Sequence, residues 1–103
     1  MSEEVYSVPN LKKIIQPVAA RYGVERVFLF GSHARGDAKS GSDIDLRIDS
    51  GELRGYFKLA GFHRELEQAL VAHVDLLTTG SLEDTFLSVI AKEEILLYEQ
   101  AKQ

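Results

Sequence analysis

The chain has 103 residues, a formal net charge of −4 and no cysteine. This length predicts one domain, residues 1–103, with a core of modest size. The acidic balance argues against stable nucleic-acid binding, which needs a basic surface. Without cysteine, disulfides and thiolate metal sites are excluded. The first ten residues lack the features of a signal peptide and no apolar run is long enough to span a membrane, so we expect a cytoplasmic protein without membrane association.

The first third of the chain predicts a helix followed by a buried strand. Apolar residues recur at helical spacing over 11–22, with Asn10 as the candidate cap and Gly23 as the stop. Pro17 falls on the polar side of this helix, where we expect a kink. Residues 24–30 end in four consecutive apolar side chains, which is typical of a strand covered on both faces.

The remaining residues predict short strands separated by helices. Residues 31–42 hold three glycines and three serines, which indicates a loop or a loop with one helical turn. Charged and apolar residues alternate over 43–49, as in a half-buried strand. The pattern then predicts a helix over 53–70, a strand over 74–77, a helix capped by Ser81, and a short strand or packed tail over 95–98. This order gives an α/β (α+β) fold, a small mixed β-sheet with helices packed on one face and the other face left for a site.

A pair of aspartates on the second predicted strand is the first sign of chemistry. Asp43 and Asp45 are two residues apart, so their side chains project from the same face of the strand. Such a pair can hold two divalent ions about 3.5–4 Å apart. Oxygen ligands alone suit Mg²⁺, or Mn²⁺, rather than zinc, and Mg²⁺ completes its shell with phosphate. Asp75, on the third strand, is the natural third carboxylate if the two strands are neighbours.

The residues just before the aspartates suit a phosphate-bearing ligand. Gly31 lets the backbone turn sharply and approach a phosphate closely. Ser32 stands where a helical turn begins, so its hydroxyl and the nearby N–H groups suit phosphate oxygens. Arg35 and Lys39 are the cations within reach, and arginine grips phosphate with a two-point fork. Ser42 offers one more hydrogen-bond donor.

Each of these features alone has an ordinary structural explanation. A lone Asp-x-Asp is usually a solvated strand face, and Gly-Ser is a common turn. A P-loop is excluded because no lysine follows Gly41, and an EF-hand because Arg47 and Ile48 stand where it needs an oxygen ligand and a glycine. The three histidines match no metal-site spacing, and we expect His33 to be a solvated loop residue. The combination in one order, with a fixed gap, is what indicates a site.

The stretch 27–46 resembles the minimal nucleotidyltransferases of the polymerase-beta-like superfamily, on the pattern Gly31-Ser32, ten residues, Asp43-x-Asp45. The resemblance covers nearly the whole chain. Short chains of this kind look like the antitoxin half of toxin–antitoxin pairs whose partner is a helical HEPN ribonuclease.

The resemblance implies transfer of AMP from ATP to a tyrosine hydroxyl of that HEPN-type toxin, in a hetero-oligomer with it. Asp43, Asp45 and Asp75 would then be the catalytic and metal-binding residues, with two Mg²⁺ ions. Gly31, Ser32 and Arg35 would hold the nucleotide. Ser42, from its position just before the acids, completes the predicted nucleotide-binding set.

One residue departs from the pattern of the resembled family. Arg47 stands where related sequences generally have an apolar or small residue. By alternation it shares the site face, where pairing with Asp49, contact with phosphate and obstruction of the site all stay open. Two other functions stay open as well. The chain would be a non-catalytic antitoxin that neutralises its partner by stoichiometric binding, or a domain with an acidic strand face and no ligand.

Overall fold

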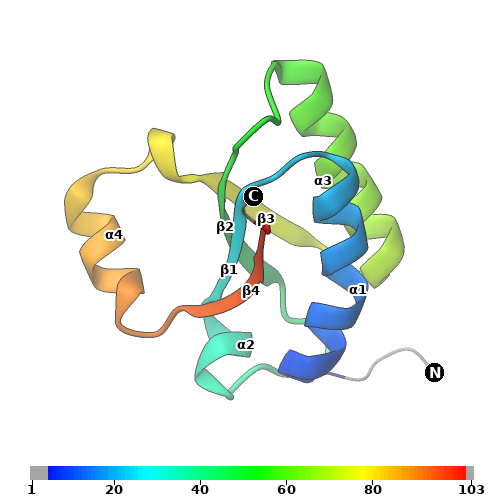
Figure 1. Cartoon of the computed structure of the whole chain (residues 1–103). Helices are drawn as coiled ribbons and strands as arrows, with labels where there is room; N and C mark the ends of the chain where they lie inside the picture. The colour runs from blue at the N-terminus through cyan, green and yellow to red at the C-terminus, as the bar shows by residue number, and fades with distance from the viewer. Residues whose placement is uncertain (1–4, 102–103) are drawn as a thin grey trace.

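The computed structural model describes residues 5–101, which form one mixed sheet with helices on both sides (Figure 1). In chain order the elements are α1 (Val8–Arg21), β1 (Arg26–Phe30), α2 (Ser32–Arg35), β2 (Ile44–Asp49), α3 (Tyr56–Leu70), β3 (Val74–Thr78), the 3₁₀ turn η1 (Thr79–Ser81), α4 (Asp84–Ala91) and β4 (Ile95–Glu99). Within this described part of the chain, no helix has both the length and the apolar character needed to span a bilayer.

The sheet has four strands in the order β3-β2-β1-β4. β1 pairs antiparallel with β2 and β4, and β2 pairs parallel with β3. The predicted mixed sheet is therefore confirmed, and so is the neighbourhood of the second and third strands on which the role of Asp75 depends. Residues 95–98 belong to a strand rather than to a packed tail.

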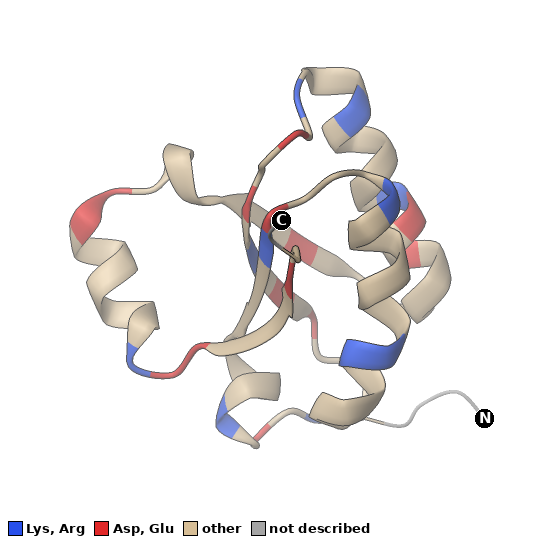
Figure 2. Ribbon diagram, in the orientation of Figure 1, with Lys and Arg blue, Asp and Glu red and all other residues tan. Residues whose placement is uncertain are grey.

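The core lies between the sheet and one pair of helices. α1 and α3 pack side by side on the same face of the sheet (Figure 1). Side chains such as Ile15 on α1, Phe62 on α3 and Leu46 on β2 are fully buried between them. Because side chains alternate along a strand, Asp45 and Arg47 must project from the opposite face. Figure 2 shows acidic and basic positions along these central strands.

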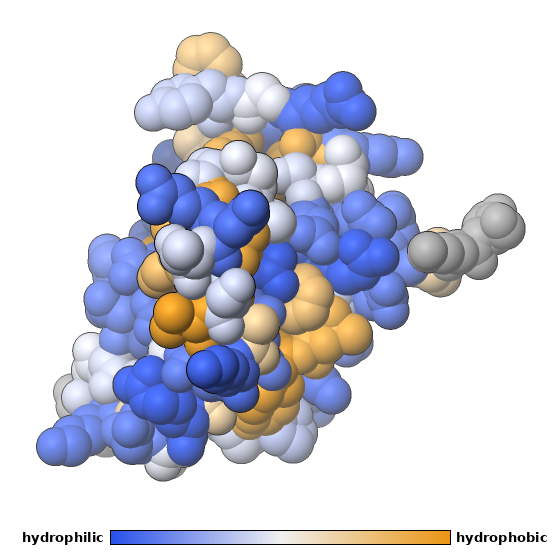
Figure 3. All heavy atoms as spheres, turned by 90° about the vertical axis from the view of Figure 1, so that its left-hand side faces the viewer, coloured by the Kyte–Doolittle hydropathy of each residue, from blue (hydrophilic) through white to orange (hydrophobic). Residues whose placement is uncertain are grey.

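The opposite face of the sheet carries the short helix α4 (Figure 1), whereas the sequence led us to expect helices on one face only. Phe86 of α4 packs edge-on against Phe30 of β1, with ring centroids 6.2 Å apart. Other apolar side chains on this side stay exposed, among them Val89 of α4 and Leu96 of β4. Apolar surface is accordingly visible among polar residues when the molecule is viewed from the α4 side (Figure 3).

The helix starts differ from the sequence-based predictions. α1 begins at Val8 because Ser7, not Asn10, is its cap: the Ser7 hydroxyl oxygen accepts the Asn10 N–H at 3.2 Å, and Pro9 suits the first turn. Ser81 does not cap α4. It lies in η1 and donates to the Thr78 carbonyl, while Glu83 precedes the helix.

Two further predictions need adjustment. The helix predicted over 53–70 starts at Tyr56, because Gly55 with φ +90° interrupts the chain before it; Leu53 is buried outside the helix. The second prediction concerns β1, which was expected to be covered on both faces. On the face that points away from α1 and α3, a charged side chain covers it. The guanidinium of Arg47 lies 4.1 Å from the centre of the Phe28 ring.

Candidate functional site

The parallel pairing of β2 with β3 places two of the predicted acids side by side. Asp45 and Asp75 are direct partners in the strand register. Their neighbours Ile44, Leu46 and Val74 point into the core, where each is at most 1% exposed. The two carboxylates therefore share the face that α1 and α3 leave open, as the sequence predicted.

This arrangement places carboxylate groups close together. Burial first, and then the charge of Asp75, a hydrogen bond with Asp75 and the charge of Asp43 raise the pKa of Asp45 from 3.8 to about 6. Arg35 opposes the rise but does not cancel it. Such mutual repulsion favours a proton or a metal ion between the carboxylates.

Asp43 is close to the pair but faces another residue. It lies just before β2, and its carboxylate oxygen Oδ1 is 3.3 Å from Nδ1 of His73. Among residues 5–101, no three histidine or acidic side chains are arranged as a ready metal cluster. The donor set of carboxylate oxygens fits Mg²⁺ or Mn²⁺, and Asp43 would have to turn from His73 to complete it.

Gly31 connects the phosphate-binding part of the motif with the aspartates. It has φ +76° and ψ −156°, a conformation that residues with a side chain rarely adopt. A Cβ atom at this position would overlap with Oδ2 of Asp45 and lie 2.9 Å from its Cγ. Glycine is thus required here because the backbone entering α2 lies against a carboxylate. The spacing between Gly31 and Asp45 in the motif reflects this contact.

The single turn of α2 carries two more of the predicted phosphate ligands, Ser32 and Arg35. Ser32 is its first residue, and the N–H groups of Gly36 and Asp37 both donate to the Ser32 carbonyl at 3.0 Å. Arg35 at its end is half exposed and forms ion pairs with Asp37 and with Glu93. Hydrogen bonds to Glu93 and then to Asp37 raise the pKa of Arg35 above its ordinary value.

Glu93 is a residue of this site that the sequence did not reveal. It lies between α4 and β4, 62 residues from Gly31, yet its Oε2 accepts the Gly31 N–H at 2.7 Å. No local pattern marks it, because its position depends on how α4 folds back over the open face. The same carboxylate approaches Arg35, at 3.3 Å and 3.4 Å from Nη1.

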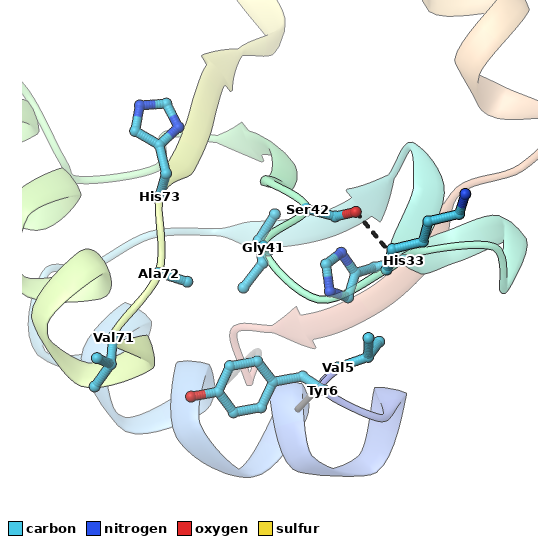
Figure 4. Close-up of a pocket in the computed structure, with 10 residues that line it drawn as sticks. Val5, Tyr6, His33, Gly41, Ser42, Val71, Ala72 and His73 are labelled. Carbon is cyan, nitrogen blue, oxygen red and sulfur yellow. Dashed lines mark hydrogen bonds between the residues drawn. The ribbon is translucent and has the colours of Figure 1, made fainter. Parts of the chain in front are cut away.

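A cavity of about 280 Å³ lies near the start of β2, and its wall includes Tyr6, Ser42 and His73 but none of the three aspartates (Figure 4). The Ser42 hydroxyl oxygen accepts the Lys39 N–H at 2.9 Å and so closes the turn before β2. His33 also lines this cavity and is only 8% exposed. The prediction of a solvated histidine was wrong, because the one-turn helix α2 packs the ring into the wall.

Arg47 is held by several partners on the open face. Its guanidinium binds Glu94 through two hydrogen bonds of 2.5 Å and 2.9 Å and donates to Thr79 Oγ1 at 2.6 Å. Asp49, whose pairing with Arg47 was one of the alternatives that the sequence left open, is 3.5 Å away. The side chain is 11% exposed, so Arg47 acts as a clamp between β2, the turn before β4 and η1.

Comparisons with known proteins show the family of this chain. The family model for the nucleotidyltransferase domain matches residues 11–98. The protein adenylyltransferase MntA of Thermococcus cleftensis is 31% identical over 93 residues, which cover 90% of this chain and 92% of that protein.

Solved structures share the fold. A toxin–antitoxin crystal structure with AMP-PNP matches with a TM-score of 0.74 at 22% identity, covering 88% of this chain and 74% of that one. A complex of the tri-AMPylated HEPN toxin of Shewanella oneidensis with its MNT antitoxin matches with a TM-score of 0.69 at 17% identity, covering 90% and 73%.

Proposed function

Because the chain belongs to the nucleotidyltransferase domain family, we propose that it transfers AMP from magnesium–ATP to a hydroxyl group of a partner protein. The observation that carries the proposal is the contact of Gly31 with Asp45, together with the pairing of Asp45 and Asp75. The backbone that suits phosphate binding therefore lies in direct contact with the carboxylates that suit metal binding. We place the reaction in the cytoplasm, where ATP is available.

In the proposed site, Asp43, Asp45 and Asp75 would hold Mg²⁺. When bound, the metal neutralises charge on the phosphate oxygens and lowers the pKa of the attacking hydroxyl. The Gly31 N–H and the Ser32 hydroxyl position the triphosphate for in-line attack.

The proposed transfer forms one bond and breaks one bond. The acceptor oxygen bonds to the α-phosphorus, the bond from that phosphorus to the bridging oxygen breaks, and pyrophosphate leaves. The hydroxyl proton passes to a carboxylate of the site and then to water.

The proposed acceptor is a tyrosine of a HEPN-type toxin, which this chain would inactivate as its antitoxin. The names of the compared proteins support this choice, since one is a protein adenylyltransferase and another is a complex with an AMPylated HEPN toxin. In the described part of the chain, the elements that bear the site are short, so we expect the acceptor to come from another molecule.

Neutralisation by binding alone is the second candidate. The observation in its favour is the apolar surface around α4, where Phe86 is 38% and Val89 65% exposed (Figure 3). A partner that covers this surface would be held independently of any chemistry at the aspartates.

The test is labelling of the co-purified partner with α-³²P-ATP and magnesium. We expect label with the native chain and none with the Asp43→Ala/Asp45→Ala double variant. The control Glu52→Ala, which removes an exposed acid in the turn after β2, should label like the native chain. Absence of label with the native chain, under conditions where ATP binds, would refute the enzymatic proposal. A double variant that still neutralises the partner at equal stoichiometry would favour masking.

A further inference from the structure

The carboxylate of Glu93 binds the donors that the proposed function assigns to the triphosphate. Oε2 accepts the Gly31 N–H at 2.7 Å, and both oxygens lie within 3.4 Å of Arg35 Nη1. The side chain is 26% exposed, so this contact is partly shielded from water. In the free protein, the predicted phosphate-binding backbone and cation are therefore both engaged by one internal anion.

A carboxylate and a phosphate compete for these groups on equal chemical terms. Both are oxygen anions that accept charge-assisted hydrogen bonds from N–H groups and from guanidinium. The Gly31 amide has one hydrogen, so it cannot serve Glu93 and a phosphate oxygen with full strength at once. Two anions at this distance also repel each other.

We propose that Glu93 is a specificity-determining residue of the nucleotide site: it occupies the phosphate-binding groups until magnesium–triphosphate displaces it. This inference rests on the proposed function, because it takes Gly31 and Arg35 as triphosphate ligands. An anion with one phosphate gains fewer contacts than a triphosphate and displaces Glu93 less readily. Glu93 thereby lowers the affinity of the site for every phosphate ligand, and it lowers the affinity most for ligands with a single phosphate.

The neighbouring contacts indicate that the side chain moves and the backbone stays. Glu94, the next residue, is held by Arg47 through two hydrogen bonds. The Glu93 N–H donates to the Ile90 carbonyl at 3.0 Å and continues the end of α4. Rotation of the Glu93 side chain toward solvent leaves both contacts in place.

The experiment measures magnesium–ATP binding by calorimetry for the native chain, Glu93→Gln and Glu99→Gln. Glutamine keeps the size of the side chain and removes the charge. Glu99 is the matched control, because it is an exposed acid of β4 whose partner is Arg26. We expect Glu93→Gln to bind about tenfold more tightly, the effect of one charge-assisted hydrogen bond, and Glu99→Gln to bind like the native chain.

Equal or weaker binding by Glu93→Gln overturns the inference, and so does an equal gain in Glu99→Gln, which would indicate only the change in net charge. Glu93→Ala should show the same gain in magnesium–ATP affinity and serves as a second variant in case Glu93→Gln does not fold. Thermal melting of both variants against the native chain checks that they are folded. If the native chain binds no magnesium–ATP, the proposed nucleotide site fails and the inference with it. Native binding that Asp45→Ala abolishes, together with an unchanged Glu93→Gln, refutes the role of Glu93 alone.

Discussion

Replacing Asp45 with asparagine should make the metal-free protein more stable at neutral pH. The side chain keeps its shape but loses the charge that burial and the neighbouring acids disfavour. The native state raises the pKa of Asp45 from 3.8 to about 6, so between these values the folded chain binds the proton more tightly than the unfolded chain. The stability linked to this proton is fully present below pH 4 and is lost as the pH rises through 6.

The size of the effect follows from the two pKa values. Each tenfold difference in proton affinity corresponds to about 1.4 kcal/mol, so the interval from 3.8 to about 6 corresponds to about 3 kcal/mol of strain above pH 6. Asp45 is only partly buried, and screening by solvent brings our expectation to about 1–2 kcal/mol. At pH 4.5 the carboxyl group is mostly protonated in the folded state, so the gain should fall to well under half of its value at pH 7.5.

The assay is urea unfolding of the native chain and Asp45→Asn in EDTA at pH 4.5 and pH 7.5, followed by far-UV circular dichroism. Asp84→Asn serves as the control for an exposed acid and should change the unfolding free energy little at either pH. Magnesium added at pH 7.5 should stabilise the native chain by mass action and leave Asp45→Asn unaffected. An asparagine variant that is less stable than the native chain at pH 7.5, or whose gain is the same at both pH values, would refute the reasoning.

Two other sites give sharp expectations for denaturant unfolding. Gly31→Ala should lower the free energy of unfolding by about 2–4 kcal/mol, because the added Cβ overlaps with Asp45 and the backbone is strained as well. A second substitution in the same chain, Asp45→Ala, should restore part of this loss. Gly36→Ala has a comparable φ of +86° but open space around the added atom, so about 1 kcal/mol is expected; equal losses at the two glycines would contradict the contact. Arg47→Met should cost about 3–5 kcal/mol, since it leaves Glu94 buried without a partner. The double variant Arg47→Met/Glu94→Gln should recover most of that loss, and a single variant as stable as the native chain would show that the clamp contributes nothing.

The features predicted correctly from sequence are those that local chemistry determines. Alternation over 43–49 assigns Leu46 to the core and Asp45 to the open face without any knowledge of the partner strands. The role of Asp75 needed one further fact, the parallel neighbourhood of β2 and β3, and the register then sets it directly opposite Asp45. Local patterns could name the acids but could not supply this register.

The errors and omissions come from contacts between distant parts of the chain. Ser7 and Asn10 are equally good cap residues, and only the actual start of α1 distinguishes them. His33 was expected to be solvated because it lies in a predicted loop, whereas its ring packs into the wall of a cavity formed with the segment before α1 and the turn before β3. Glu93 reaches Gly31 across 62 residues, so no spacing rule could have found it.

Gly31 contacts both groups that disfavour nucleotide binding in the ligand-free site. On one side its backbone lies against Asp45, whose charge is destabilised by Asp75 and Asp43. On the other side its N–H is bound to the carboxylate of Glu93. A metal ion alone would relieve the first repulsion and leave Glu93 in place, whereas a triphosphate alone would add negative charge beside Asp45. Magnesium and triphosphate together satisfy both sides, so on the proposed function each raises the affinity of the site for the other by the same factor.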